Sequence, residues 1–343
     1  MSEVYVNLSP ILKSSGTLLY DFAWYINSGR IGVAVFFAIS GFVILKSIKG
    51  DKISGTKIFL IKRFFRLYPA FWLSIFLWSL VMILRGEQTN FEQIIANITM
   101  LPLLFNQDML LELYWTLETE LIFYFLCLLI FYFTLSSKPI NLFIISLFFL
   151  IVFAITNHFH LLINEQHPSL RTLPFHLSLM FWGALFRLYF ESKREYVLFI
   201  NRKISIKNIF ILLTIMILFI PIVALIKGYL TNEFKLFQMG LAYILAIATF
   251  LLLSTIFKIK NKFLVWIGKI SYSMYLFHPI VFYSLFWLLQ NKLPEIFSNQ
   301  HLSIYIIVNV MLSILVSAIV YYIIEKPSIN IGNKLAENIK SHQ

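Results

Sequence analysis

Two arginines stand at the start of a long apolar run, in the segment KRFFRLYP at residues 62–69. Arg63 and Arg66 are three residues apart, so on a helix they share one face. Two guanidinium groups on one face can donate paired hydrogen bonds to phosphate oxygens. Ordinary anchoring of a helix end by basic side chains is the alternative, and the spacing alone does not decide between them. The pair is a candidate site for a phosphorylated substrate.

Two carboxylates lie in the apolar segment YWTLETELIFY at residues 114–124. Glu118 and Glu120 are two residues apart and therefore point to different faces of a helix. A carboxylate inside a span is costly, and it can act as a base, bind a hydroxyl or pair with a cation. An interfacial carboxylate, with Trp115 in the aromatic belt, is the simpler interpretation. It suits Glu118 better than Glu120.

A histidine lies near the middle of another apolar run, in GKISYSMYLFHPI at residues 268–280. His278 directly precedes Pro279, and Ser271 and Tyr272 lie upstream of it. Such a histidine can carry a proton, or it can bond a backbone carbonyl that the proline leaves without a donor. Both interpretations remain open from the sequence.

The composition requires lipid around these segments. Of 343 residues, 59% are apolar and 13% are charged, whereas soluble domains are nearer half apolar and a quarter charged. The apolar runs are continuous over about 20 residues, the length that crosses about 30 Å of hydrocarbon as a helix. We predict an all-α, polytopic integral membrane helical bundle of about nine spans. The predicted spans are 31–48, 67–85, 113–134, 140–157, 173–190, 208–227, 236–257, 267–289 and 303–324.

The segment 94–106 is apolar, but it is short and contains Pro102. We expect it to be interfacial or re-entrant rather than to span the membrane.

The basic residues fall into alternate loops. Of the 28 lysines and arginines, 21 lie in one set of loops and seven in the other, although the net charge of +12 alone could have suggested nucleic acid. This bias predicts that the loops of the richer set, and the C-terminus, are cytoplasmic. We expect an extracytoplasmic segment at 1–29, a membrane domain at 30–326 and a cytoplasmic tail at 327–343. Nucleic acid is not an expected partner, and the lipid bilayer is.

No metal site and no permanently bound cofactor are expected. His158, His160 and His167 cluster in one loop, but their spacing matches no standard zinc signature. An interfacial loop explains them better.

Four segments together resemble the membrane acyltransferase 3 family. Residues 29–44, GRIGVAVFFAISGFVI, are similar to its G-x-x-G-V-x-x-F-F-x-x-S-G-F helix. RFFRLYP resembles its R-x-x-R-x-x-P element, and WTLETELIFY its W-S-L-x-x-E-x-x-F-Y element, which aligns Glu120 with the family's acid. ISYSMYLFHPI with IEKP at 324–327 resembles its S-Y-x-x-Y-L-x-H helix and closing E-(K/R)-P. The four lie in the family's order along nearly the whole chain.

The resemblance implies a ten-helix core that moves acyl groups, often acetyl, from cytosolic acyl-CoA onto sugars of surface glycans or lipids. It implies catalytic roles at Glu120 and His278. The donor and acceptor would contact the following residues: Arg63, Arg66, Tyr68, Trp115, Ser271 and Tyr272.

One departure from the family concerns its first helix, which carries a histidine that is its presumed base. This sequence has no histidine before His158. The nine spans predicted here and the extracytoplasmic position of residues 1–29, which contain no signal peptide, point to the same missing helix. Our hypothesis is that a helix upstream of Met1 carries this base.

We therefore expect O-acyl transfer, most simply of acetyl from acetyl-CoA, to a hydroxyl of a surface glycan or glycolipid. The protein would be a multi-pass protein of the cell membrane, in bacteria the inner membrane. The rival class is a transporter or flippase for a glycolipid or small molecule, although the inverted repeats of many such folds are not evident. A truncated, inactive acyltransferase is a third alternative.

Overall fold

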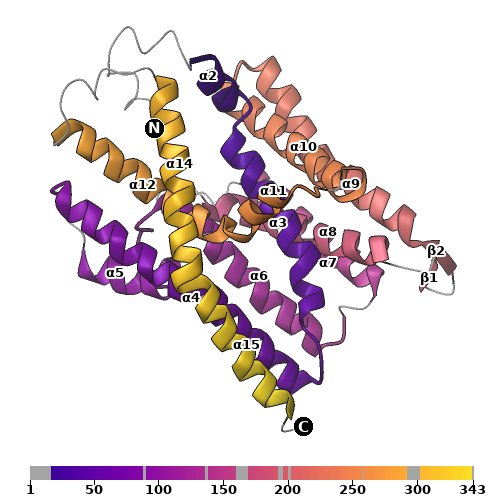
Figure 1. Ribbon diagram of the computed structural model, residues 1–343. Helices are drawn as coiled ribbons and strands as arrows, with labels where there is room; N and C mark the ends of the chain where they lie inside the picture. The colour runs from indigo at the N-terminus through magenta and orange to yellow at the C-terminus, as the bar shows by residue number, and fades with distance from the viewer. Residues whose placement is uncertain are drawn as a thin grey trace. The chain divides into compact units, whose positions relative to one another are not determined.

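A computed structural model describes residues 17–87, 90–135, 138–159, 169–191, 196–199, 202–257, 259–291 and 302–341. Helices make up nearly all of it (Figure 1). The α-helices are α2 Thr17–Tyr25, α3 Ser28–Ser47, α4 Lys52–Leu84, α5 Phe91–Ile98, α6 Trp115–Tyr132, α7 Pro139–His158, α8 Ser169–Glu191, α9 Ile206–Leu230, α10 Phe234–Thr255, α11 Lys262–Lys269, α12 Ser271–Asn291, α14 Leu302–Val320 and α15 Lys326–Ser341. The short 3-10 turns are η2 Pro102–Phe105 and η3 Glu112–Tyr114, and η4 Tyr321–Glu325 is a π-turn.

The chain divides into two compact units. Unit 1 comprises residues 1–24, 57–111 and 259–343, and unit 2 comprises residues 25–56 and 112–258. The two arginines of the KRFFRLYP segment and His278 belong to unit 1, whereas Glu120 belongs to unit 2.

The predicted membrane-spanning bundle is confirmed. Among the described residues, eight helices are long and apolar enough to cross a membrane, and they coincide with eight of the nine predicted spans. Their outward faces carry large apolar side chains, such as Phe76 and Phe219, each 65% exposed, and Met311, 66% exposed. Water does not stabilise such faces, so lipid must cover them.

The ninth predicted span, 173–190, is also a helix, α8, but it is not apolar enough to meet the same criterion. Its position explains why. Every residue from 174 to 186 is buried, which makes α8 the central helix of unit 2. A helix that is enclosed by other helices does not have to be apolar on all sides, so α8 carries polar residues such as His176 and Ser178.

Two glycines let α3 pack closely on α8. A Cβ atom added to Gly41 of α3 would collide with the carbonyl oxygen of Met180, and one added to Gly183 of α8 would collide with that of Ala38. Backbone approach of this kind is a common way for helices to associate inside membranes. The Ser40–Gly41 pair in the predicted first span is therefore a packing element.

We expect Gly41→Ala to destabilise the protein by about 1–3 kcal/mol, because the added methyl group overpacks the α3–α8 contact. Gly32→Ala is the matched control on the same helix, since a Cβ there meets nothing within 4 Å. Thermal unfolding in detergent measures both changes. Equal unfolding midpoints for the two variants would contradict the assigned packing role.

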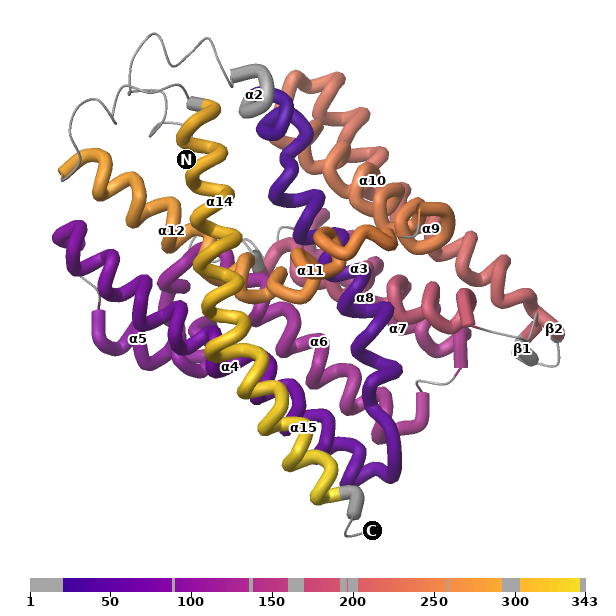
Figure 2. The backbone as a smooth tube through the Cα atoms, in the orientation of Figure 1, coloured from indigo at the N-terminus to yellow at the C-terminus, as the bar shows by residue number. Residues whose placement is uncertain are grey.

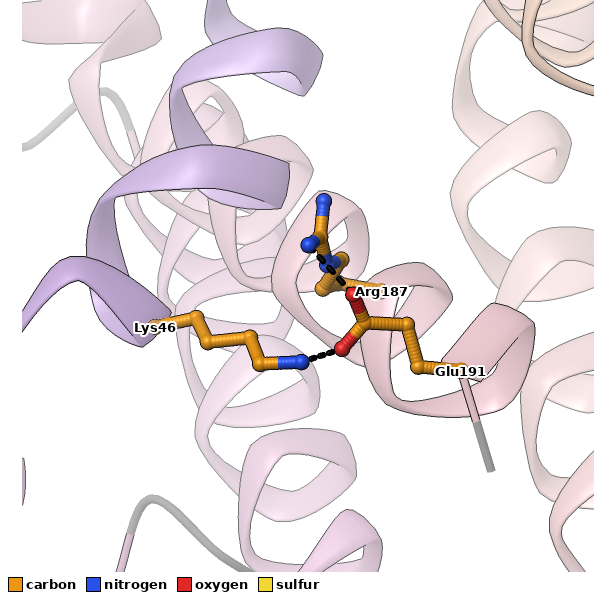
Figure 3. Close-up of polar contacts among 3 residues, drawn as sticks. All are labelled: Lys46, Arg187 and Glu191. Carbon is orange, nitrogen blue, oxygen red and sulfur yellow. Dashed lines mark ion pairs between the residues drawn. The ribbon is translucent and has the colours of Figure 1, made fainter. Parts of the chain in front are cut away.

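Helices α3 and α8 run in the same direction. In their N-terminal halves, the ring centroids of Phe37 and His176 are 4.9 Å apart. Near their C-terminal ends, Glu191 of α8 forms ion pairs with Lys46 of α3 and with Arg187, one turn earlier on α8 (Figure 3). Both helices were predicted to cross from outside to inside, so their parallel course agrees with the alternation of the spans.

Helices α6 and α10 also run parallel to α8. The ring contacts that fix these directions are Trp115–His176 and Phe123–Phe181 for α6, and Tyr243–His176 and Phe250–Phe186 for α10. The N-terminal parts of α3, α6 and α8 therefore meet at one end of unit 2, with Tyr243 of α10 beside them.

In unit 1, α4 and α12 run in the same direction. The Tyr272 hydroxyl donates to the Leu67 carbonyl at 2.8 Å, and the rings of Trp78 and Tyr283 lie 5.2 Å apart, one pair toward each end of the contact. The predicted spans 67–85 and 267–289 share a direction, as this packing requires. Helix α4 has 33 residues, about 50 Å, so it extends well beyond the predicted span at its N-terminal end.

The apolar segment 94–106 does not form a spanning helix. It contains part of α5, of eight residues, and the turn η2, which begins at Pro102. Helix α5 returns beside α4, because Trp72 Nε1 donates to the Ile98 carbonyl at 3.0 Å. Its length of about 12 Å is too short to cross a bilayer. The interfacial placement remains a prediction.

Helices α14 and α15 continue one another through the π-turn η4, and the tube in Figure 2 follows them without a break. Pro327 explains the widened turn, since it lacks the N–H that would bond the Ile323 carbonyl, and its ring crowds the preceding turn. Residues 326–341, predicted as a tail, thus form a helix.

A short β-hairpin was not predicted. Strands β1 Tyr196–Phe199 and β2 Arg202–Ser205 pair antiparallel, with Tyr196 opposite Ser205, in the basic loop that precedes α9. The first strand is wholly apolar and the second begins with two basic residues, so no alternating pattern in the sequence marks the hairpin. Residues 1–16 of the predicted N-terminal segment, and His160 and His167, lie outside the described residues.

Candidate functional site

The arginine segment of α4 is held by two other helices of unit 1. On one side, Tyr272 of α12 bonds the Leu67 carbonyl. On another, a Cβ at Gly332 of α15 would lie 2.8 Å from Phe65 Cβ, so α15 passes very close to α4 at this point. Two segments that lie more than 200 residues after α4 in sequence thus contact it on either side of Arg66.

A buried carboxyl group lies at this meeting point. Glu325, 1% exposed, accepts a 2.6 Å hydrogen bond from Ser273 Oγ of α12, and Arg66 interacts with it electrostatically. Its other oxygen, Oε1, is buried and has no hydrogen-bond partner. The nearby charge of Arg66 favours the charged form of this carboxyl group, whereas its burial disfavours that form. The π-turn that ends at Glu325 is of a kind often found at functional sites.

The other predicted donor-site residues make mainly internal contacts. Arg63 lies over the Phe59 ring, with its guanidinium carbon 5.3 Å from the ring centroid. Tyr68 donates to the Thr99 carbonyl at 3.0 Å, so its hydroxyl links α4 to the end of α5. Ser271 donates to the Gly268 carbonyl at 2.9 Å, at the start of α12. Roles in substrate binding for Tyr68 and Ser271 remain predictions.

His278 bonds the backbone of its own helix. Its Nδ1 lies 3.0 Å from the carbonyls of both Met274 and Tyr275. Pro279 lacks the N–H that would otherwise reach Tyr275, so the histidine supplies the missing donor. This is the contact that the structural interpretation of His278 requires. Because Nδ1 must carry the proton, Nε2 keeps a lone pair, and a catalytic role remains a prediction.

The acid of unit 2 is buried between α3 and α6. Glu120 is 5% exposed, and its Oε1 accepts hydrogen bonds from Tyr124 OH at 2.6 Å and from Ser40 Oγ at 3.3 Å. It lies five residues, about 8 Å, into α6. Two hydroxyl donors stabilise a charged carboxylate at this depth.

Glu118 is also 5% exposed, because protein encloses the first turns of α6. Trp115 is partly buried in unit 2, where it stacks on the His176 ring at a centroid distance of 5.1 Å. The position of both residues near the headgroups remains a prediction.

The comparison with protein families gives one match. The family model for the acyltransferase domain, acyltransferase 3, matches residues 4–322. The chain belongs to the acyltransferase 3 family. No curated protein and no solved structure matches the chain.

The segments that resemble acyltransferase 3 motifs pair in space within each unit. In unit 2, Ser40 from the G-V-x-x-F-F-x-x-S-G segment bonds Glu120 from the W-x-L-x-x-E segment. In unit 1, the S-Y-S segment contacts two other motifs. Tyr272 bonds the Leu67 carbonyl beside the R-x-x-R segment, and Ser273 bonds Glu325 of the closing E-K-P.

Two clusters of polar side chains that the fold brings together were not identified from the sequence. Glu325 and Ser273 were noted only as parts of motifs, and nothing in the sequence indicates that they touch. The second group is Arg30, His176 and Tyr243 of unit 2. His176 sits inside a predicted span and could have been singled out as an intramembrane ionisable group.

Proposed function

We propose that this acyltransferase 3 protein is a membrane O-acyltransferase that moves an acyl group, most simply acetyl, from cytosolic acyl-CoA to a hydroxyl of a surface glycan or glycolipid. Family membership supports acyl transfer in general. The donor, the acceptor and the acyl chain are the parts that we propose.

The observation that carries the proposal is the convergence of three distant segments on Arg66 in unit 1. Basic side chains that only anchor a helix in the headgroups do not need such an arrangement. Arg63 and Arg66 would bind the CoA phosphates, as guanidinium groups do with paired hydrogen bonds. Glu325 would hold Arg66 in place, and Tyr272 would fix the backbone beside it.

Glu120 is suited to the acceptor side of the reaction. Acyl transfer forms a bond between the acceptor oxygen and the thioester carbon, breaks the carbon–sulfur bond and releases CoA as a thiol. The proton lost by the acceptor hydroxyl ends on the CoA sulfur. Glu120 would orient that hydroxyl and carry the proton or pass it to a further base, the role that the resemblance gives to the histidine of the family's first helix.

The orientation follows from the charges. We propose that the basic loops face the cytosol, so that the arginine pair meets acyl-CoA, and that the N-terminal ends of α3, α6 and α8 face outward. The protein would then lie in the cell membrane, in bacteria the inner membrane, with its C-terminus cytoplasmic.

Incubating membranes that contain the protein with labelled acetyl-CoA tests this function. We expect label on extracted glycans or glycolipids, sensitive to mild base as an ester is, and none from membranes without the protein. Flux of a glycolipid across vesicles without any transfer of label would favour a transporter and contradict the proposal. Transfer to lipid or protein amines would contradict the assignment of a hydroxyl acceptor.

A further inference from the structure

A cationic cluster occupies the end of unit 2 where α3, α6 and α8 begin. Arg30 of α3 reaches Tyr243 of α10, with a distance of 3.4 Å between Nη1 and the hydroxyl oxygen. The same hydroxyl lies 2.6 Å from His176 Nε2 on α8. His176 is 1% exposed, and the Phe37 and Trp115 rings pack against it. The cluster therefore joins three helices of one unit.

The hydrogen-bond roles in this cluster follow from its chemistry. A guanidinium group only donates, so Arg30 donates to the oxygen of Tyr243. Either tautomer of His176 satisfies the contact with Tyr243. With the proton on Nδ1, Tyr243 donates to Nε2 and Nδ1 is left as a donor. An anion beside Nδ1 would select this tautomer.

The cluster contains more donors than it uses. Arg30 Nε and His176 Nδ1 are both buried and have no hydrogen-bond partner. Among the residues that the structure describes, no carboxylate forms an ion pair with Arg30. Arg30 itself is partly exposed near the N-terminal end of α3, but its Nε is buried, and a buried donor without an acceptor is costly. An anionic oxygen ligand would satisfy both requirements.

We propose that Arg30, held by Tyr243 and His176, binds an anionic group of the acceptor, either a carboxylate on a sugar or a phosphate on its carrier. This rests on the proposed function, in which unit 2 receives the acceptor. The site is linked to Glu120 through α3, since Phe37 contacts His176 and Ser40, one turn further on, bonds Glu120. Arg30 and Ser40 are ten residues apart on α3, about 15 Å, so the anionic group and the reacting hydroxyl would be held along one helix.

Ligand binding to the purified full chain in detergent tests the proposal. Glucuronic acid and glycerol 1-phosphate are the two anionic probes, and glucose and glycerol are their neutral counterparts. We expect at least one anion to bind and raise the unfolding midpoint, while its neutral counterpart does not. Binding of glucuronic acid would indicate the carboxylate source, and binding of glycerol 1-phosphate the phosphate source.

Three variants assign this binding to the cluster. Arg30→Gln should weaken binding of the anion about tenfold or more, as expected for loss of a charge-assisted hydrogen bond. Arg30→Lys should retain part of the affinity, and Tyr243→Phe should lose part of it without any change of charge. Arg171→Gln is the matched control, since Arg171 is an exposed arginine of unit 2 that bonds Asn157.

Absence of anion binding overturns the proposal. So does unchanged binding in Arg30→Gln, or an equal loss in Arg171→Gln. If Arg30→Gln does not fold, Arg30→Lys and Tyr243→Phe decide. Acyl-CoA binding and label transfer are measured on the same preparation. Anion binding that depends on Arg30 in a protein that transfers no acyl group would refute the proposed function and leave the anion site standing. Transfer of label that does not depend on Arg30, with the same choice of acceptor in Arg30→Gln, would support the proposed function and refute the anion site.

Discussion

Replacing Arg63 and Arg66 together with alanine is expected to weaken the binding of acyl-CoA by about 10²–10⁴-fold. Each arginine would lose charge-assisted hydrogen bonds to phosphate, worth about 1.5–3 kcal/mol per bond. Equilibrium binding of acetyl-CoA to the purified protein measures the effect. Dephospho-CoA, which lacks the 3′-phosphate, should bind the wild type more weakly than CoA does, and the difference should be smaller in the variant.

Glu325 complicates this variant, because Arg66→Ala leaves a buried carboxyl group without its cation. Adding Glu325→Gln to the double variant should restore its stability without restoring the affinity for CoA. Lys57→Ala with Lys62→Ala is the matched control, since it removes two positive charges from exposed positions on the same helix. Wild-type affinity in the arginine variant, or an equal loss in the lysine variant, would remove the assigned role.

The helices and their directions could be predicted because lipid imposes a simple rule on sequence. A span that faces lipid must be apolar for about 20 residues, and α9 and α14 show this pattern clearly. Alternate crossing then sets directions, and the parallel courses of α3 with α8 and of α4 with α12 agree with it. Helix α8 was also predicted, although it lacks a fully apolar sequence because other helices, and not lipid, surround it.

The contacts inside the site could not be predicted in the same way. Arg30 looked like an ordinary basic residue at a span end, and only the fold brings Tyr243, more than 200 residues away, to its guanidinium. Glu325 and Ser273 are likewise joined by the packing of α12 against the π-turn. For His278, the sequence contained the decisive fact, the proline that follows it, and left two interpretations open. The carbonyl contacts now favour the structural one.

Replacing Glu120 with glutamine is expected to lower the rate of acyl transfer by about 10²–10⁴-fold, the usual contribution of a positioned acid or base. Glutamine keeps the shape of the side chain, and its amide oxygen still accepts from Tyr124 and Ser40, so the fold of unit 2 should persist. Affinity for acyl-CoA should not change, because the arginine pair lies in the other unit. The rate of label transfer at saturating acetyl-CoA measures the loss.

Glu118→Gln is the control for this variant, because Glu118 is just as buried and only two residues away. The Glu118→Gln variant should retain most of the transfer rate if the reaction needs a carboxylate at the position of Glu120 and not merely a buried negative charge in α6. Tyr124→Phe should have a smaller effect than Glu120→Gln, since it removes one donor to the carboxylate and leaves the carboxylate itself. Equal losses in Glu118→Gln and Glu120→Gln would mean that burial of charge in α6, and not acid–base chemistry at Glu120, is what the reaction needs.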